Sequence, residues 1–186
     1  MTIWVFTMKQ CEAVETSHSS RFSGLHNVDE PQFKAAMRCI ASTVNVITSG
    51  ESGSSSGMTA TAVCSVSAAP PSVLIVVNQD NRSHAVIERT GAFAVNILSS
   101  RQESIALHFA SKAADPFASI AHRAGITKSP ILEGGVGYLE CVVDSQTKVG
   151  THSIFVGRVI ASEQRDLLPL AYHNGKFVSV IEANGS

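Results

Sequence analysis

Polar and apolar positions alternate along Gly57–Pro71 in a way that is unusual for a core strand. Successive side chains of a strand point to opposite faces, so one face of this stretch is small and apolar. The opposite face carries mostly hydroxyl groups, from Thr59, Thr61, Ser65 and Ser67. The pattern fits either an edge strand whose polar face meets water or a shallow polar wall that holds a flat ligand.

Runs of apolar and β-branched residues predict strands along most of the remaining chain. Runs of strand length lie at 44–48, 73–77, 92–98, 138–149, 153–162 and 177–180. The run 73–77 is apolar throughout, so we expect both of its faces to be buried. The glycine- and serine-rich stretch 49–57 is expected to form a flexible turn between two strands. Gly150-Thr151 predicts a hairpin, and Asn174-Gly175 marks a turn before the last strand.

Two helices are predicted in the first half of the chain. Asp29 can cap the first helix. Its apolar stripe, which we expect to be buried, comprises Phe33, Ala36, Met37 and Ile40. A short helix over 84–90 should begin at a cap provided by Asn81 or Ser83 and end before Gly91.

Two more helices are predicted in the second half. Ser100 and Glu103 have the spacing of a capping box, and the stripe that follows contains Ile105, Ala106 and Phe109. Asp115-Pro116 predicts a helix over 117–124. Six or seven strands with helices between them, and no long βαβ alternation, favour an antiparallel barrel decorated by helices.

Composition is typical of a single globular domain. Of the 186 residues, 44% are hydrophobic and 16% are charged. Residues 1–27 have no periodicity and are expected to form a flexible arm, which leaves 28–183 as the domain. The formal net charge of -1 provides no basic field for nucleic acid. Sparse charge and plentiful small apolar residues suggest that a partner subunit covers part of the surface.

The cysteines and the hydropathy bear on location and metal binding. The four cysteines lie far apart without a CxxC pair, which argues against a zinc ribbon or a thioredoxin-type dithiol. The start of the chain lacks the features of a signal peptide, and no run has the roughly 20 apolar residues of a membrane span. We therefore expect a cytoplasmic protein with reduced thiols and no membrane association.

Two further sites could carry chemistry. Asn81, Arg82 and Ser83 precede a predicted helix, whose free amides and partial positive charge suit a phosphate, although they also suit ordinary capping. His152 follows a glycine turn and could project into the mouth of a barrel, or simply be exposed. The chain has no G-x-G-x-x-G, Walker lysine or G-x-S-x-G motif, and its histidines form no HExxH pair. We predict no metal site.

An ordered set of motifs resembles a known family. The motifs are Phe33-Lys34-x-Ala36-Met37-Arg38, Thr43-Val44-x-Val46-Ile47-Thr48, Gly57-Met58-Thr59-Ala60-Thr61-Ala62, Ser65-Val66-Ser67-x-x-Pro70-Pro71, Asn81-x-Ser83, Phe93-x-Val95-Asn96-Ile97-Leu98 and Gly150-x-His152-x-Ile154-Phe155-Val156-Gly157. In this order they resemble the short-chain flavin reductases, which are the reductase components of two-component flavin-dependent monooxygenases. Each motif is weak alone, but the ordered set is specific.

The resemblance implies a mainly β fold with inserted helices, namely a six-stranded antiparallel split β-barrel that forms homodimers. It implies an NAD(P)H-dependent flavin reductase that binds FMN or FAD and supplies reduced flavin to a partner monooxygenase. Residues implied to line the flavin ring are Thr59, Ala60, Thr61, Cys64, Ser65 and Asn96. Asn81, Arg82 and Ser83 would hold the flavin phosphate, and His152 would stand near the nicotinamide.

The resemblance leaves alternatives open. The family often has an acidic residue before the histidine, and this chain has Thr151 there. No basic pocket for a 2′-phosphate is evident, which favours NADH over NADPH. A related flavoprotein could retain its flavin and reduce a second substrate, such as a cobalt-corrin intermediate of cobalamin synthesis. A non-catalytic flavin-binding dimer on the same fold is a third possibility.

Overall fold

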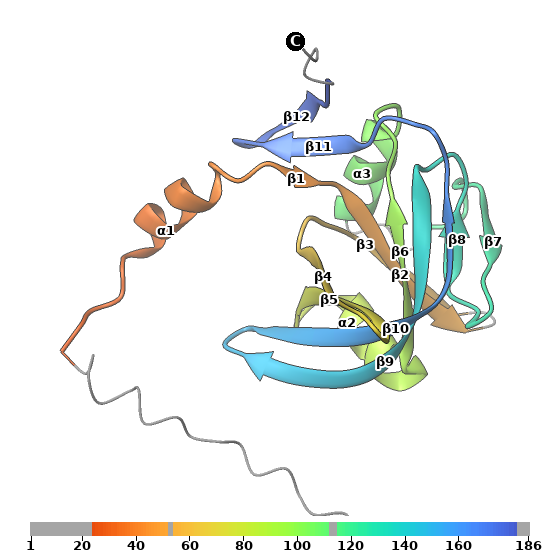
Figure 1. Ribbon diagram of the computed structural model, residues 1–186, viewed down its shortest axis with the longest axis horizontal. Coiled ribbons are helices and arrows are strands. Elements are labelled where there is room, and N and C mark those ends of the chain that lie inside the picture. Colours follow the sequence, from red (N-terminus) through yellow and green to blue (C-terminus); the bar gives the residue numbers. More distant parts are fainter. Residues whose placement is uncertain (1–23, 52–53, 112–114, 182–186) are drawn as a thin grey trace, which may run out of the picture. The chain divides into compact units, whose positions relative to one another are not determined.

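The structure, a computed structural model, describes residues 24–51, 54–111 and 115–181 (Figure 1). Two compact units are distinguished, residues 1–35 and 36–186. The predicted arm lies outside the described residues up to position 23. The helices of the described chain are α1 (Glu30–Met37), α2 (Arg82–Thr90) and α3 (Glu103–Ala110). Its strands are β1 (Ser42–Thr43), β2 (Asn45–Glu51), β3 (Ser54–Ala60), β4 (Val63–Ala68), β5 (Pro71–Asn78), β6 (Ala92–Ile97), β7 (His122–Ala124), β8 (Pro130–Leu132), β9 (Gly137–Val149), β10 (His152–Gln164), β11 (Leu170–His173) and β12 (Lys176–Ser179).

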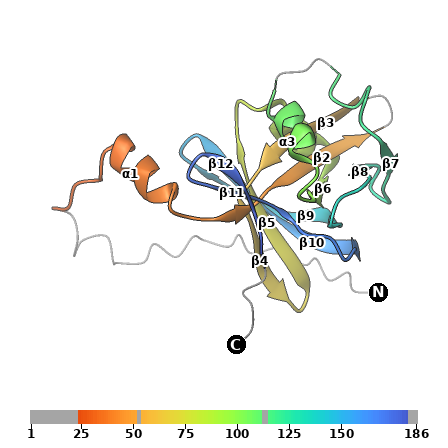
Figure 2. The ribbon, with the colours of Figure 1, turned by 90° about the horizontal axis from the view of Figure 1, so that it is seen from above.

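A curled antiparallel sheet dominates the second unit (Figure 2). Its strand order is β3-β2-β6-β9-β10-β5-β4. β3 and β4 stand at opposite ends of this order, yet only Thr61 and Ala62 separate them in sequence. Two linking residues span on the order of 10 Å, so the two ends of the sheet must approach each other. The predicted mainly β, antiparallel barrel-type fold is confirmed, with seven strands in the described sheet.

The stretch Gly57–Pro71 is not one strand, as its alternation suggested. It is divided between β3, which pairs with β2, and β4, which pairs with β5. The division falls at Thr61, where the chain leaves one end of the sheet and starts the other. The expected flexible turn 49–57 is also mostly strand, because Glu51 pairs with Ser54 and Ser49 with Ser56. Glycine is required at position 57 of β3, because a Cβ there would lie 2.5 Å from the ring of Phe109.

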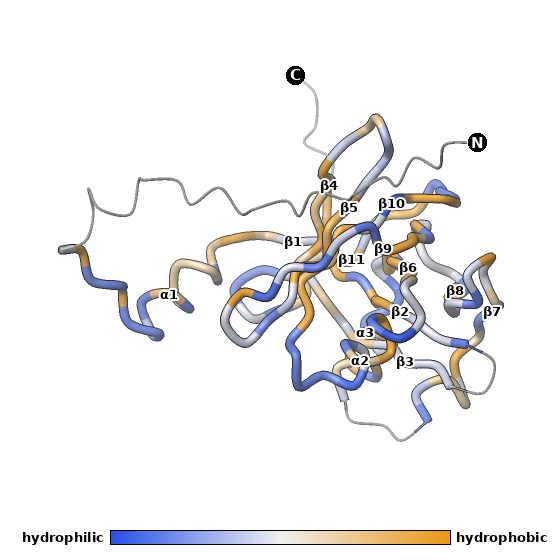
Figure 3. The backbone as a smooth tube through the Cα atoms, turned by 90° about the horizontal axis from the view of Figure 1, so that it is seen from below, coloured by the Kyte–Doolittle hydropathy of each residue, from blue (hydrophilic) through white to orange (hydrophobic). Residues whose placement is uncertain are grey.

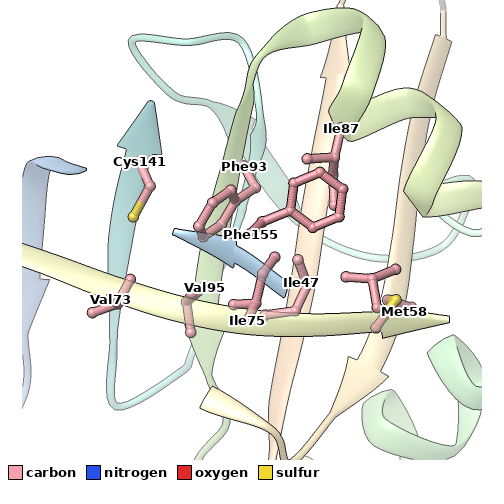
Figure 4. Packing of buried hydrophobic residues seen from close by; sticks show 10 residues of the cluster. Ile47, Met58, Val73, Ile75, Ile87, Phe93, Val95, Cys141 and Phe155 are labelled. Atoms are coloured by element: carbon pink, nitrogen blue, oxygen red, sulfur yellow. The ribbon is translucent and has the colours of Figure 1, made fainter. Parts of the chain in front are cut away.

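Two apolar clusters form the core. The larger one, shown in Figure 4, packs Ile47, Met58, Val73, Ile75, Val77, Ile87, Phe93, Val95, Cys141 and Phe155. The second packs Val44, Val46, Leu98, Ala106, Phe109, Leu132 and Leu170. In β5 only one face is fully buried, since Leu74 and Val76 on the other face are partly exposed. The expectation of two buried faces was wrong, because the described chain covers the face of Leu74 and Val76 only in part.

The helix predictions have mixed outcomes. Asn81 caps α2 by accepting from the amide of Ser83 at 2.9 Å, and Gly91 ends the helix at φ 65°. α3 exists, but Ser100 does not cap it; Gln102 holds the N-cap position without a capping side-chain hydrogen bond. No helix forms over 117–124. The chain there makes turns and then β7, which pairs with β8, so pairing outweighed the local helix signal.

The apolar stripe of α1 is exposed, contrary to expectation. Asp29 caps the helix as predicted, accepting from the amide of Gln32 at 2.8 Å. Phe33, Met37 and Ile40 are 56%, 48% and 53% exposed. Figure 3 shows polar and apolar residues together along α1, whereas apolar residues run along the sheet strands. Helical periodicity identifies the apolar side of a helix but not what covers it.

Both predicted turns are present. Gly150, at φ 56°, lies in the connection between β9 and β10. Asn174 and Gly175, at φ 49° and 79°, join β11 to β12. β11 also pairs with β1, so β1, β11 and β12 form a small second sheet.

Candidate functional site

A groove of about 730 Å³ lies between β3, the start of α2 and α3. Three predicted site residues line it: Thr59, Asn81 and Arg82. Its other lining residues are Gly57, Met58, Asn78, Asp80, Phe109, Ala110, Ser111 and Pro116. Residues that are far apart in the sequence therefore line one groove. We call this hollow the central groove.

A second hollow, of about 360 Å³, adjoins the central groove and shares Thr59 and Ala110 with it. We call it the ring hollow. It brings in two more predicted residues, Ala60 and Thr61. Its other lining residues are Val44, Ala106, Leu107, Tyr172, Gly175 and Phe177. This largely apolar surface beside a strand edge suits a flat aromatic ligand.

A third hollow, of about 420 Å³, adjoins the central groove on another side and shares Arg82 and Pro116 with it. We call it the outer hollow. The remaining lining residues are Ser54, Ser55, Asp115, Phe117 and His122. The rings of Phe117 and His122 have centroids 5.1 Å apart. Arg82 therefore lies where two hollows meet.

The start of α2 has the features of an anion-binding site. Its first amides carry partial positive charge, and Arg82 adds a full charge beside them. The Ser83 hydroxyl is buried, with the residue 1% exposed, and it has no hydrogen-bond partner among the described residues. A buried hydroxyl without a partner is costly, but Ser83 is not among the residues that line the three hollows, so Asn81 and Arg82 are the residues of this motif that line the central groove. Asn81 itself is engaged in capping.

The hydroxyl face predicted for Gly57–Pro71 does not act as one surface. The Thr59 hydroxyl donates to the carbonyl of Ala106 in α3 at 2.6 Å. Cys64 and Ser65 are exposed on β4 and are not among the residues that line the three hollows. β3 and β4 therefore differ: residues of β3 line two of the hollows, whereas β4 has an exposed face and lines none of the three.

His152 lies at the start of β10 and is exposed. Its strand partner is Asn78, which lines the central groove. The Thr151 hydroxyl lies 2.9 Å from His152 Nδ1, so a hydroxyl orients this ring where the family often has a carboxylate. Gln79 Nε2 donates to the carbonyls of Gly150 and His152 at 3.1 and 3.0 Å. These bonds join the loop before α2 to the β9–β10 hairpin.

Asn96 is used inside the fold. It is 2% exposed, and its side-chain amide donates to the Val46 carbonyl at 3.2 Å and to the Thr48 hydroxyl at 3.0 Å. Its oxygen accepts from the Leu132 amide at 2.8 Å. Asn96 therefore ties β8 to the main sheet, and it is not among the lining residues of the three hollows.

Sequence reasoning missed several lining residues. Asn78 and Asp80 could have been found, because they are continuous with the predicted phosphate site. Phe109, Pro116 and the residues of β11 and β12 carried no such signal. Among the described residues, no group of three or more His, Cys, Asp or Glu could hold a metal ion. No described helix is long and apolar enough to cross a membrane.

Comparison with known proteins identifies the family. The family described as "Flavin reductase like domain" matches residues 37–180. The chain belongs to this flavin reductase family. The family resemblance stated from the sequence motifs is thereby confirmed.

Relatives and solved structures extend over most of the chain. It is 36% identical over 155 residues to the reductase component of 4-nitrophenol 4-monooxygenase/4-nitrocatechol 2-monooxygenase of Rhodococcus opacus, covering 82% of each protein. It is 34% identical over 161 residues to the FMN reductase (NADH) RutF of Stutzerimonas stutzeri, covering 86% of this chain and 88% of that one. The NADH:FAD oxidoreductase SgcE6 of Streptomyces globisporus, solved with NAD and FAD fragments, superposes with a TM-score of 0.81 at 30% identity, covering 87% of this chain and 100% of that one.

Proposed function

We propose that this protein is an NADH-dependent flavin reductase that supplies reduced flavin to a partner monooxygenase. The observation that carries the proposal is the central groove, where Thr59 of β3 meets Asn81 and Arg82 of the α2 start. These residues were predicted from separate motifs as flavin contacts, and all three line this one groove. Membership of the flavin reductase family supports the same activity.

The site residues fit a flavin mononucleotide unit. The first turn of α2, with Arg82 lining the central groove, would hold the phosphate, and Ser83 remains a proposed contact in the same turn. The isoalloxazine ring would lie in the ring hollow, along Thr59, Ala60 and Thr61. Backbone amides at the ring edge would stabilise the negative charge that reduction places there. Cys64 and Ser65 remain proposed contacts at the rim, and Asn96 would contribute only by holding β6 to β2 and β8.

The reaction is NADH + H⁺ + flavin → NAD⁺ + reduced flavin. When bound, the flavin supplies the N5 position that accepts the hydride, with its electron pair, from nicotinamide C4. The chain's own task is alignment, because direct hydride transfer needs stacking rather than an acid–base pair. His152, next to the groove wall at Asn78, would position the nicotinamide. The proton that completes the reduction comes from solvent.

The relatives' names support the proposed partner. The Rhodococcus opacus relative is named as the reductase component of a monooxygenase. A reductase of this kind releases reduced flavin, which an oxygenase uses with dioxygen. NADH is proposed as the donor because the Stutzerimonas stutzeri relative is named as an NADH enzyme.

We propose that the protein is a homodimer. The support is the exposed apolar stripe of α1, formed by Phe33, Met37 and Ile40. A stripe of this kind is costly to leave in water, and a second copy of the chain would cover it. Sedimentation analysis tests this: a concentration-independent monomer would contradict it.

The activity is tested by anaerobic mixing of the purified protein with flavin and NADH. Loss of the visible absorbance of oxidised flavin is expected, and its absence with both NADH and NADPH would overturn the proposal in favour of a non-catalytic flavin-binding dimer. Gel filtration then separates the two catalytic alternatives. Ready loss of flavin is expected for a reductase that releases its product, whereas firm retention would favour an enzyme that reduces a second substrate, such as a cobalt corrin.

A further inference from the structure

A buried hydrogen bond joins α2 to β10. His84 Nε2 lies 2.8 Å from the hydroxyl of Ser153. His84 is 6% exposed and Ser153 is 0% exposed, so water does not compete for this contact. Buried polar pairs of this kind fix the elements that carry them, because breaking the bond leaves an unsatisfied group.

The two partners adjoin the two halves of the proposed site. His84 directly follows Ser83 in the phosphate-binding turn, and its own amide donates to the carbonyl of Asn81 at 2.9 Å. Ser153 directly follows His152, the residue proposed to position the nicotinamide. The bond therefore connects the turn that holds the phosphate to the strand that presents His152.

Further groups surround the imidazole. Glu88 Oε2 lies 3.5 Å from His84 Nδ1, one helical turn along α2. Gln146 of β9 donates to Glu88 Oε1 at 2.7 Å and lies 3.5 Å from the Ser153 hydroxyl. The hydrogen bond from Gln146 lowers the pKa of Glu88. The ring of Phe155 packs edge-on with its centroid 5.3 Å from that of His84.

Ser153, His84 and Glu88 lie in the order of a catalytic triad, in which a serine nucleophile contacts a histidine base and an acidic residue orients that base. Ser153 is fully buried, however, and is not among the lining residues of the three hollows. A hydroxyl that no substrate can reach is not a nucleophile. The arrangement is therefore suited to positioning rather than to bond cleavage.

We propose that His84 is a positioning residue that, through Ser153, holds the phosphate-binding turn of α2 in register with His152. This rests on the proposed reductase function. Hydride transfer requires donor and acceptor atoms roughly 3–3.5 Å apart, and a misplacement of about 1 Å costs on the order of 100-fold in rate. The His84–Ser153 hydrogen bond is buried, whereas the hydrogen bonds of Gln79 that join the same two segments are exposed.

The test compares His84→Phe, Ser153→Ala and the double variant. His84→Phe keeps a ring against Phe155 but removes the hydrogen bond, and Ser153→Ala removes the hydroxyl with little loss of volume. Ser162→Ala is the matched control, because Ser162 is an exposed serine of the same strand. Each protein is measured for its flavin Kd, its anaerobic single-turnover rate of flavin reduction by NADH, and its Tm.

The expected result is a loss of roughly tenfold or more in the single-turnover rate for either variant, with flavin Kd little changed. The double variant should lose no more than the larger single loss, because both changes break one link. Should His84→Phe fail to fold, Ser153→Ala alone decides the question.

Two results would overturn the proposal in distinguishable ways. A wild-type protein that does not reduce flavin removes the proposed function and, with it, the positioning role. If wild type is active and the variants lose only Tm, reducing flavin at the wild-type rate well below that Tm, the link is structural and the positioning role alone is lost.

Discussion

His152 pairs with Asn78 across the antiparallel strands β10 and β5, one strand from the central groove that Asn78 lines. Side chains that pair in this way lie on the same face of a sheet. The histidine is thus next to the proposed flavin-binding wall without forming it. This relationship separates a role in nicotinamide binding from a role in flavin binding.

The first prediction is that His152 affects the use of NADH but not the affinity for flavin. His152→Ala should lower kcat/KM for NADH by about tenfold, which is about 1.4 kcal/mol of transition-state stabilisation. Flavin affinity should stay nearly intact, because His152 does not line the hollows assigned to flavin. Steady-state kinetics and flavin titration measure the two quantities. Equal losses in both would show that His152 contacts the flavin instead.

Arg82 should contribute through phosphate binding. A hydrogen bond to a charged group is worth about 1.5–3 kcal/mol, so Arg82→Ala should weaken FMN binding by about tenfold or more. Riboflavin, which lacks the phosphate, should bind nearly as well to the variant as to wild type. Arg101→Ala is the control, because Arg101 is exposed and is not among the lining residues of the hollows. A similar loss for FMN and riboflavin would argue against a phosphate at α2.

The outer hollow should distinguish FAD from FMN. It begins at Arg82, so a group attached to the flavin phosphate would extend towards Phe117 and His122. His122→Ala should therefore lower kcat/KM for FAD more than for FMN, by about 1 kcal/mol of lost stacking, or roughly fivefold. His173→Ala, an exposed histidine of β11, should leave the ratio unchanged. An unchanged ratio in His122→Ala would mean that the adenosine part lies elsewhere.

Cys64 reports whether β4 contacts the flavin. Its thiol is exposed and donates to the carbonyl of Ser65 at 3.3 Å. If β4 forms the rim of the ring site, saturating FMN should slow alkylation of Cys64 while leaving that of exposed Cys39 unchanged. Peptide mass mapping of the alkylated protein follows both sites. Equal rates with and without FMN would remove Cys64 and Ser65 from the proposed site.

Cys141, which is buried, should resist alkylation in the folded protein, unlike the exposed Cys64. Burial, with the neighbouring charge of Glu140, raises the pKa of the Cys141 thiol from 9.0 to about 12. The folded state therefore keeps this thiol protonated, and its alkylation should require unfolding. Because the folded pKa is the higher one, stability is retained below pH 9.0 and lost as pH rises towards about 12. Denaturation of wild type and Cys141→Ala across that range should show a smaller alkaline loss in the variant.

Local sequence signals located most elements and the parts of the site. The cap at Asn81, the glycine turn at Gly150 and the strand run of β5 all depend on interactions within a few residues. Such interactions are encoded locally, and the ordered motifs added the family. The helix predicted over 117–124 failed because pairing with β8, a distant segment, decided its structure.

What the sequence by itself determined was the mainly β class, the family and three residues that line the central groove: Thr59, Asn81 and Arg82. Only the tertiary structure divided Gly57–Pro71 between β3 and β4, since a break in a strand depends on which neighbours it pairs with. Only packing could bring His84 to Ser153, because no local pattern encodes a contact between segments 69 positions apart.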